Sequence, residues 1–237
     1  FELTPAQHLA LAERVRSAGC EYVVSVWDLE AFEWIDPVVS AYKIGSGDLT
    51  APPFLRAGAA TGKPLIISTG LSERAEVEAA VEYVRSAQPR YLDPTMLALL
   101  QCTSMYPIDA SDANLAVMQS FTALNVTVGY SDHTIGWRAL EVAAAMGAQL
   151  LEFHFTDHKE DRAFRDHQLS LDIDDLRSLV RALDEINVLK GTAGKAPQLI
   201  EIESGHIASF RRAVYPSRLI EAGEVLTEQN LCVLRPN

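Results

Sequence analysis

Six short apolar segments, separated by helical patterns, constrain the fold of this chain more than any other feature. The segments cover residues 21–27, 41–46, 64–70, 97–103, 126–131 and 149–155. Between two of them, Val77, Ala80, Val81 and Val84 repeat with the spacing of one helix face. Such regular β–α alternation predicts a parallel sheet with right-handed crossovers. The nearly continuous apolar character of the segments indicates strands that are buried on both faces.

Two arrangements satisfy this alternation: a doubly wound open sheet and a (β/α)8 barrel. No G-x-G-x-x-G motif follows any of the segments, so a dinucleotide-binding sheet has no direct support. Polar residues end almost every segment, and a barrel gathers all such ends on one rim, where barrel enzymes hold their active sites. We therefore predict a (β/α)8 TIM barrel. The chain supplies about six of its strand–helix units, and two further strands are expected on the N-terminal side.

The pattern changes after about residue 189, so we assign the barrel domain to residues 1–189. Residues 190–209 open with a run rich in glycine and lysine and are predicted to be a linker. Residues 210–237 have a β-like pattern but are too few to fold alone. Since the chain also lacks an initiator methionine, we expect it to be a partial or processed product.

Composition excludes several classes of function. The net charge of −12 argues against nucleic-acid binding, which needs a basic footprint. No apolar run reaches the roughly 18 residues of a membrane span, so no membrane association is expected. Cys20, Cys102 and Cys232 are odd in number and widely spaced, unlike a disulfide framework or a zinc site. We therefore expect a globular protein of the reducing cytoplasm.

Two histidines follow consecutive strands. His133 lies in the motif SDHT and His154 in the motif EFHFT, about one β–α unit apart. Adjacent strand ends would bring their imidazoles together over the barrel mouth. Two neutral imidazoles can hold a divalent cation and leave positions open for water and substrate. On spacing alone, a core or capping role for one of them is an equal alternative.

A lysine and a set of serines suggest a place for an anion. Lys43 lies in an otherwise apolar segment, so it must be paired or face a site. Ser46, Ser68, Ser104 and Ser131 lie at or near the strand ends. A cation ringed by hydroxyls suits a phosphate or a carboxylate. Three alternatives stay open: turn-capping serines, a buried salt bridge at Lys43, and a Schiff-base lysine as in class I aldolases.

Five motifs together resemble the sialic acid synthases, in the order seen in that family. They are AYKIGSGD (41–48), GKP to STG (62–70), QCTSMYP (101–107), GYSDHT (129–134) and EFHFT (152–156). The end of the chain, from residue 210, is similar to the start of the family's antifreeze-like (SAF) domain. The resemblance covers nearly the whole chain.

The resemblance implies a (β/α)8 barrel with a divalent metal, Mn²⁺ or Mg²⁺, in a protein that acts as a homodimer. It implies condensation of phosphoenolpyruvate with N-acetylmannosamine or a related 2-acetamido sugar. His133 and His154 match the family's metal ligands, and Lys43 with the four serines matches its phosphoenolpyruvate contacts. Tyr106 matches a tyrosine that lines the site. Asp166, near the end of the charged loop 157–167, matches an acid that contacts the sugar.

The chain departs from the family at two positions. Gln101 and Phe153 stand where many relatives carry a basic residue, so the exact sugar stays open. A glutamate and a lysine of the family's site lie on strands that we expect outside this chain. Two other functions also stay open: a Schiff-base aldolase that uses Lys43, and a non-catalytic sugar-binding barrel. The paired histidines argue against the second, because a mere binder has no need of an open metal.

Overall fold

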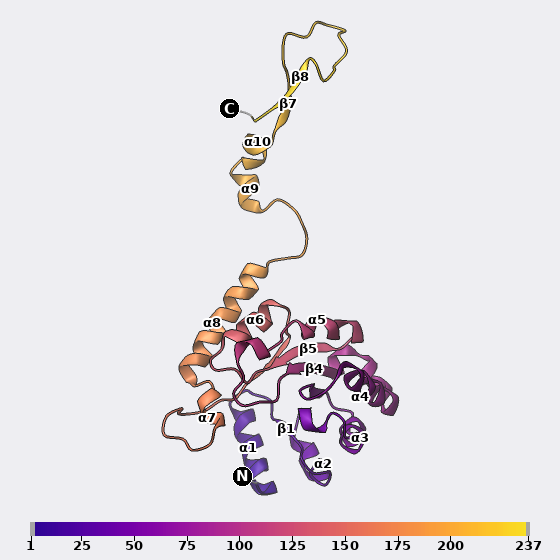
Figure 1. Cartoon of the computed structure of the whole chain (residues 1–237), viewed down its shortest axis with the longest axis vertical. Coiled ribbons are helices and arrows are strands. Elements are labelled where there is room, and N and C mark those ends of the chain that lie inside the picture. The colour runs from indigo at the N-terminus through magenta and orange to yellow at the C-terminus, as the bar shows by residue number, and fades with distance from the viewer. Residues whose placement is uncertain (1–2, 236–237) are drawn as a thin grey trace. The chain divides into compact units, whose positions relative to one another are not determined.

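The computed structural model describes residues 3–235, which fall into two compact units that divide after Lys190. The first unit is built on six strands, shown with their helices in Figure 1. They are β1 (Val23–Ser25), β2 (Ala41–Ile44), β3 (Leu65–Ser68), β4 (Leu97–Cys102), β5 (Thr127–Ser131) and β6 (Leu150–Glu152). Each strand corresponds to one of the six predicted segments.

The strand order distinguishes between the two predicted arrangements. Each strand pairs in parallel with the next one along the chain, so the order in the sheet is β1-β2-β3-β4-β5-β6. A doubly wound sheet would reverse its order at a switch point. The uninterrupted order instead forms a curled sheet, in the manner of half a barrel. The predicted α/β class is confirmed, and the doubly wound arrangement is excluded.

Helices precede or connect the strands and cover the outside of the sheet (Figure 1). They are α1 (Pro5–Ser17), α2 (Ala31–Ile35), α3 (Pro52–Thr61), α4 (Arg74–Ala87), α5 (Val117–Phe121) and α6 (Arg138–Ala145), with α7 (Asp166–Leu169) and α8 (Ile173–Lys190) after β6. In α4 the four residues with helical spacing, Val77, Ala80, Val81 and Val84, are all buried. The spacing therefore identified the inner face of this helix correctly.

The core lies between the sheet and these helices. All six residues of β4 are buried, as expected for a strand covered on both faces. Tyr42, Leu65, Ile67 and Leu99 are among the largest fully buried side chains. Burying one such side chain contributes about 1.5–3 kcal/mol. Because three neighbouring strands, β2, β3 and β4, supply these residues, their packing stabilises the order of the strands at the centre of the sheet.

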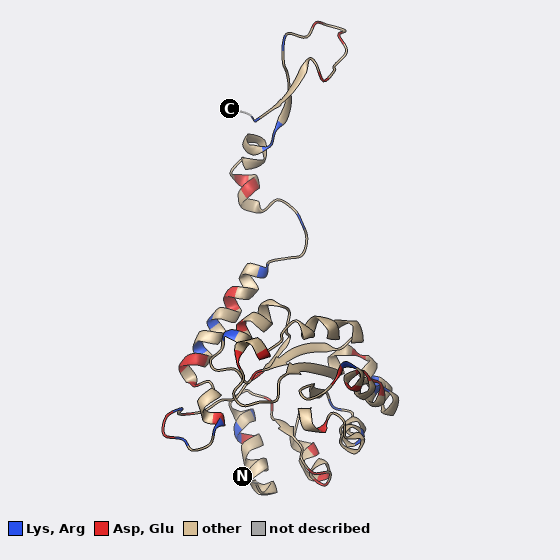
Figure 2. Cartoon of the chain, viewed as in Figure 1, with Lys and Arg blue, Asp and Glu red and all other residues tan. Residues whose placement is uncertain are grey.

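Charged residues are concentrated on the helices and loops, and acidic and basic side chains alternate along α8 (Figure 2). In the six strands of the sheet, only Lys43 and Glu152 are charged. An ionisable group in a buried strand costs free energy unless it is paired. The presence of Lys43 and Glu152 in these otherwise uncharged strands therefore requires a structural or functional explanation. Among the residues that the structure describes, no helix is both long and apolar enough to cross a membrane.

Three elements are shorter than the sequence pattern predicts. β1 and β6 have three residues each, and each is hydrogen-bonded to one neighbour only in this sheet. The helical segment between β4 and β5 contains only the five-residue α5. Asn114 has a left-handed backbone with a φ of 46°, a conformation that a continuous right-handed helix excludes.

The second unit contains the short helices α9 (Leu199–Glu203) and α10 (His206–Phe210), and the antiparallel hairpin of β7 (Ala213–Pro216) and β8 (Leu231–Leu234). The hairpin lies in the region after residue 210 that has the β-like pattern. The segment predicted to be a linker, residues 190–209, contains α9 and most of α10. The reason is local: Gln198 and Glu201 form a reciprocal capping box that starts a helix.

Gly129 in β5 offers a test of how closely the sheet is packed. A Cβ at this position would lie 2.4 Å from the carbonyl oxygen of Leu150 and 2.5 Å from Leu100 Cδ2. We expect Gly129→Ala to lower the free energy of unfolding of the first unit by about 1–3 kcal/mol, because a strand backbone must move to admit the methyl group. Urea unfolding followed by circular dichroism measures this change.

The matched control is Gly194→Ala. It adds the same methyl group where nothing lies within 4 Å, so the unfolding midpoint of the first unit should not change. Equal stability of Gly129→Ala and the parent would show that β5 and β6 are not packed as described.

Candidate active site

One cavity of about 750 Å³ lies at the carboxyl ends of the six parallel strands. Parallel pairing places all of these ends at the same edge of the sheet. Because the sheet is curved, that edge forms the wall of the cavity. Most of the site residues predicted from the sequence line the cavity: Lys43, Ser46, Ser68, Ser104, Tyr106, Ser131, His133 and His154. Asp166 is not among the lining residues.

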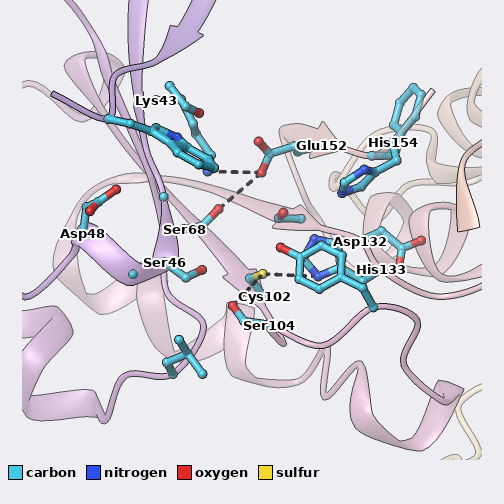
Figure 3. A pocket seen from close by; sticks show the side chains of 18 residues that line it. Lys43, Ser46, Asp48, Ser68, Cys102, Ser104, Asp132, His133, Glu152 and His154 are labelled. Atoms are coloured by element: carbon cyan, nitrogen blue, oxygen red, sulfur yellow. Dashed lines mark hydrogen bonds and ion pairs between the residues drawn. The ribbon is translucent and has the colours of Figure 1, made fainter. Parts of the chain in front are cut away.

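Lys43 projects from β2 into the cavity and also has a partner. Its Nζ lies 3.4 Å from Oε2 of Glu152, and the Lys43 side chain is 10% exposed. Ser68 donates a hydrogen bond from Oγ to the same carboxylate oxygen at 3.3 Å. Figure 3 shows both contacts as dashed lines. Facing a site and forming a buried salt bridge were separate predictions for Lys43, and the structure combines them.

The serines gather around a glycine that follows β3. Gly70 donates its backbone N–H to Ser46 Oγ at 3.1 Å. A Cβ on Gly70 would lie 2.2 Å from Ser104 Oγ and 2.9 Å from Ser46 Oγ. The missing side chain therefore lets hydroxyls from two strand ends approach each other. Ser131, the last residue of β5, is buried at the same wall.

The two histidines lie face to edge at the ends of β5 and β6. Their ring centroids are 5.3 Å apart. Tyr106 packs against both rings, with centroid distances of 4.0 Å to His133 and 5.6 Å to His154. The structure thus brings together the three ring side chains that the sequence placed on different strand ends.

Both histidines have one ring nitrogen engaged. Nδ1 of His133 lies 2.8 Å from the carbonyl oxygen of Thr103, so Nδ1 carries the proton of that hydrogen bond. Nδ1 of His154 lies 3.5 Å from Oδ2 of Asp166. This arrangement leaves Nε2 of each ring as the lone-pair donor, as in histidines that bind metals. Within residues 3–235, no three His, Cys, Asp or Glu side chains are grouped so that they could hold a metal ion.

Burial and the nearby thiol of Cys102 shift the pKa values of the two histidines. Burial lowers the pKa of His154, and the neighbouring His133 lowers it further. Burial also lowers the pKa of His133, but its contact with Cys102 and the Thr103 carbonyl raise it by more. Cys102 Sγ lies 3.9 Å from His133 Nδ1. Burial raises the pKa of this thiol, yet the contact with His133 leaves it below its usual value.

Asp166, at the start of α7, contacts His154 and does not line the cavity. Its Oδ1 is buried without a hydrogen-bond partner, although Arg165 Nε lies 3.4 Å away as an ion pair. The Arg165 guanidinium also stacks 4.9 Å above the Tyr106 ring. The sugar contact predicted for Asp166 stays a prediction, since this carboxylate contacts His154.

Several residues of the cavity were missed by the sequence reasoning. Glu152, Cys102 and Asp132 all line the wall. Glu152 had a usable signal: like Lys43, it is an isolated charge in an apolar strand, and two such opposite charges predict a pair. Asp132 accepts hydrogen bonds from Tyr130 OH at 3.0 Å and from Thr134 N–H at 2.8 Å. It therefore holds the turn that carries the neighbouring histidine.

The two departures from the family pattern lie in different places. Phe153 lines the cavity. Gln101 does not: it is buried, and its Nε2 donates to the carbonyl oxygen of Ala113 at 3.2 Å. Successive side chains of a strand point to opposite faces, so Gln101 faces away when Cys102 faces the cavity. Of the two departures, only Phe153 therefore changes the lining of this cavity.

The model of the NeuB family matches residues 1–195, which include all six strands of the curled sheet and the whole cavity wall. The chain belongs to the NeuB family. This membership confirms the resemblance to the sialic acid synthases that the five motifs carry.

Relatives of this NeuB-family chain include the N,N'-diacetyllegionaminic acid synthase of Legionella pneumophila. It is 33% identical over 238 residues, covering 100% of this chain and 66% of that protein. The N-acetylneuraminate-9-phosphate synthase of Mus musculus is 31% identical, covering 98% of this chain and 63% of that protein. The chain therefore spans about two thirds of the length of these relatives.

Among solved structures, the fold resembles the N-acetylneuraminic acid synthetase of Leptospira borgpetersenii, crystallised in complex with citrate. The TM-score is 0.79 at 27% sequence identity, and the match covers 87% of this chain and 70% of that chain. The fold of the chain is thus similar to that of a protein named as a sialic acid synthetase.

Proposed function

We propose that this chain forms part of an enzyme that condenses phosphoenolpyruvate with N-acetylmannosamine or a related 2-acetamido sugar, releasing phosphate and a sialic (nonulosonic) acid. One observation carries the proposal: a buried lysine ringed by serines lies in the same cavity as two histidines with open Nε2 atoms. An anion site and a candidate metal site side by side suit a reaction that joins an anion to an aldehyde. The names of the relatives support the same chemistry.

The anion part of the cavity suits phosphoenolpyruvate. Lys43 supplies the cation, and Ser46, Ser68, Ser104 and Ser131 supply hydroxyl donors for phosphate or carboxylate oxygens. Because the surrounding strands are apolar, these contacts act in a medium of low dielectric constant, where they are stronger than in water. Their role is electrostatic and positional.

The histidine part of the cavity suits a divalent metal, Mn²⁺ or Mg²⁺. His133 and His154 would be two of its ligands, since the Thr103 carbonyl accepts a hydrogen bond from Nδ1 of His133 and Asp166 lies beside Nδ1 of His154, which directs each Nε2 to the metal. Such an ion supplies Lewis-acid polarisation of the sugar aldehyde. The lowered pKa of His154 favours the neutral imidazole that ligation requires.

The bond changes follow from the two substrates. C3 of phosphoenolpyruvate attacks the aldehyde carbon, and the aldehyde oxygen takes a proton. Water adds at C2 and gives up one proton, which balances the proton taken by the aldehyde oxygen. The C2–O bond to phosphate then breaks as the new C2 hydroxyl becomes a carbonyl, and its second proton leaves with the phosphate. Tyr106 and Asp166 are the candidates for positioning the sugar, and Phe153 gives that part of the wall an apolar surface. Holding both substrates in one geometry supplies much of the rate acceleration.

The wider architecture is also part of the proposal. We place the curled sheet within a (β/α)8 barrel, and residues 210–237 at the start of an SAF domain. The whole protein would act as a homodimer in the cytoplasm. The coverage of the relatives, about two thirds of their length, supports a longer protein.

The direct test is phosphate release from phosphoenolpyruvate by the full-length protein with N-acetylmannosamine and other 2-acetamido sugars. We expect release that depends on both the sugar and a divalent metal, and that stops with a chelator and returns with Mn²⁺ or Mg²⁺. Release without a sugar, or none with any sugar tested, would refute the proposed reaction.

The histidine pair is tested by metal content. His133→Ala and His154→Ala should each bind far less Mn²⁺ than the parent at equal protein concentration, because each removes one imidazole ligand. Equilibrium dialysis with elemental analysis measures this. His167→Ala is the matched control, since His167 contacts Thr156 rather than the pair. If both variants bind as much Mn²⁺ as the parent, His133 and His154 are not metal ligands.

Lys43 distinguishes anion binding from Schiff-base chemistry. Lys43→Ala should weaken phosphoenolpyruvate binding at least tenfold, because hydrogen bonds to a charged group contribute about 1.5–3 kcal/mol. Lys43→Arg should rescue it only in part, since a planar guanidinium differs from an ammonium. A pyruvate adduct on Lys43, trapped by borohydride and found by mass spectrometry, would favour the aldolase instead.

A further inference from the structure

Glu152 binds two of the groups that the proposed function assigns to the substrate anion. Its Oε2 lies 3.4 Å from Lys43 Nζ and 3.3 Å from Ser68 Oγ (Figure 3). The three residues lie on β6, β2 and β3, so the contact crosses the mouth of the curled sheet. A carboxylate of the protein thus makes the contacts expected for a carboxylate or phosphate of the ligand.

Lys43 needs such a partner when no substrate is bound. Its side chain is 10% exposed, and a buried ammonium without a counter-charge is costly. Its hydrogen bond to the carbonyl oxygen of Ile44, at 3.4 Å, is long. Glu152 is the other charged residue of the six strands. The pair therefore gives the buried ammonium of Lys43 a counter-charge from within the protein.

Glu152 is the partner that can leave. Its side chain is 40% exposed, whereas that of Lys43 is 10% exposed. Both side chains line the cavity, but Lys43 lies on β2, which pairs with two strands, whereas Glu152 ends β6, which pairs with one strand in this sheet. Because like anions compete for the same donors, a substrate anion that takes Lys43 and Ser68 must displace this carboxylate.

We propose that Glu152 is an internal counter-anion, which occupies the anion subsite of the empty cavity and is displaced when phosphoenolpyruvate binds. This inference rests on the proposed function, which makes phosphoenolpyruvate the anion of the cavity. The exchange keeps Lys43 paired in both states. It also weakens substrate binding, because binding must first break the internal contacts.

The test is the Kd of phosphoenolpyruvate, measured by isothermal titration calorimetry on the full-length protein. Glu152→Gln keeps the shape of the side chain but removes its charge, so the Kd should fall about tenfold. Glu152→Ala should shift it in the same direction, and the Kd of inorganic phosphate should follow in both variants. An unchanged or higher Kd in Glu152→Gln and Glu152→Ala would overturn the proposal and make Glu152 a support for Lys43.

Asp48→Asn is the matched control. Asp48 lines the same cavity and loses the same charge, but the ion pair of Lys43 is with Glu152. The Kd of phosphoenolpyruvate for Asp48→Asn should differ from that of the parent by less than twofold. A gain as large as that of Glu152→Gln would mean a general charge effect and would overturn the proposal.

A double-mutant cycle isolates the contact itself. In a Lys43→Met background, Glu152→Gln should tighten binding much less than in the parent, because the glutamate no longer competes for the lysine. An equal gain in both backgrounds would show that Glu152 acts independently of Lys43.

Phosphate release by the parent protein separates this inference from the proposed function. Tighter binding in Glu152→Gln without any release by the parent would refute the reaction and keep the counter-anion. Release by the parent without tighter binding in the variant would refute the counter-anion alone. Absence of phosphoenolpyruvate and phosphate binding in all variants would refute both.

Discussion

The parallel pairing of six consecutive strands is the constraint on which the candidate site depends. Because each strand pairs with the next along the chain, every carboxyl end lies at one edge of the sheet. The curl then brings opposite ends of that edge together. Ser68 and Glu152 are 84 positions apart in the sequence, yet they share a hydrogen bond.

The cavity has two chemically different parts, and the strand order explains why they are neighbours. The ends of β2 and β3 supply Lys43 and Ser68, while the ends of β5 and β6 carry His133 and His154 (Figure 3). Apolar strands below keep the dielectric constant low, so each charge in the wall needs a partner. The contacts between Lys43 and Glu152, and between His154 and Asp166, meet this need.

Local patterns were sufficient for the family, the class of fold and most of the wall. A buried helix face repeats every three or four residues, as Val77 to Val84 do in α4. Polar residues at strand ends identified the histidine pair, Lys43 and the serines before any geometry was known. Where the patterns failed, a local conformation had competed with them: the left-handed Asn114 shortened α5, and the capping box at Gln198 placed a helix in the expected linker.

The sequence by itself determined which residues end the strands, because strand spacing and polarity are properties of neighbouring residues. Only the tertiary structure decided which of these side chains meet. It paired Lys43 with Glu152, set Asp166 behind His154, and turned Gln101 away from the cavity. Each of these contacts depends on the register and curl of strands far apart in the chain. Such non-local geometry is set by the packing of the whole sheet, and no short stretch of sequence contains it.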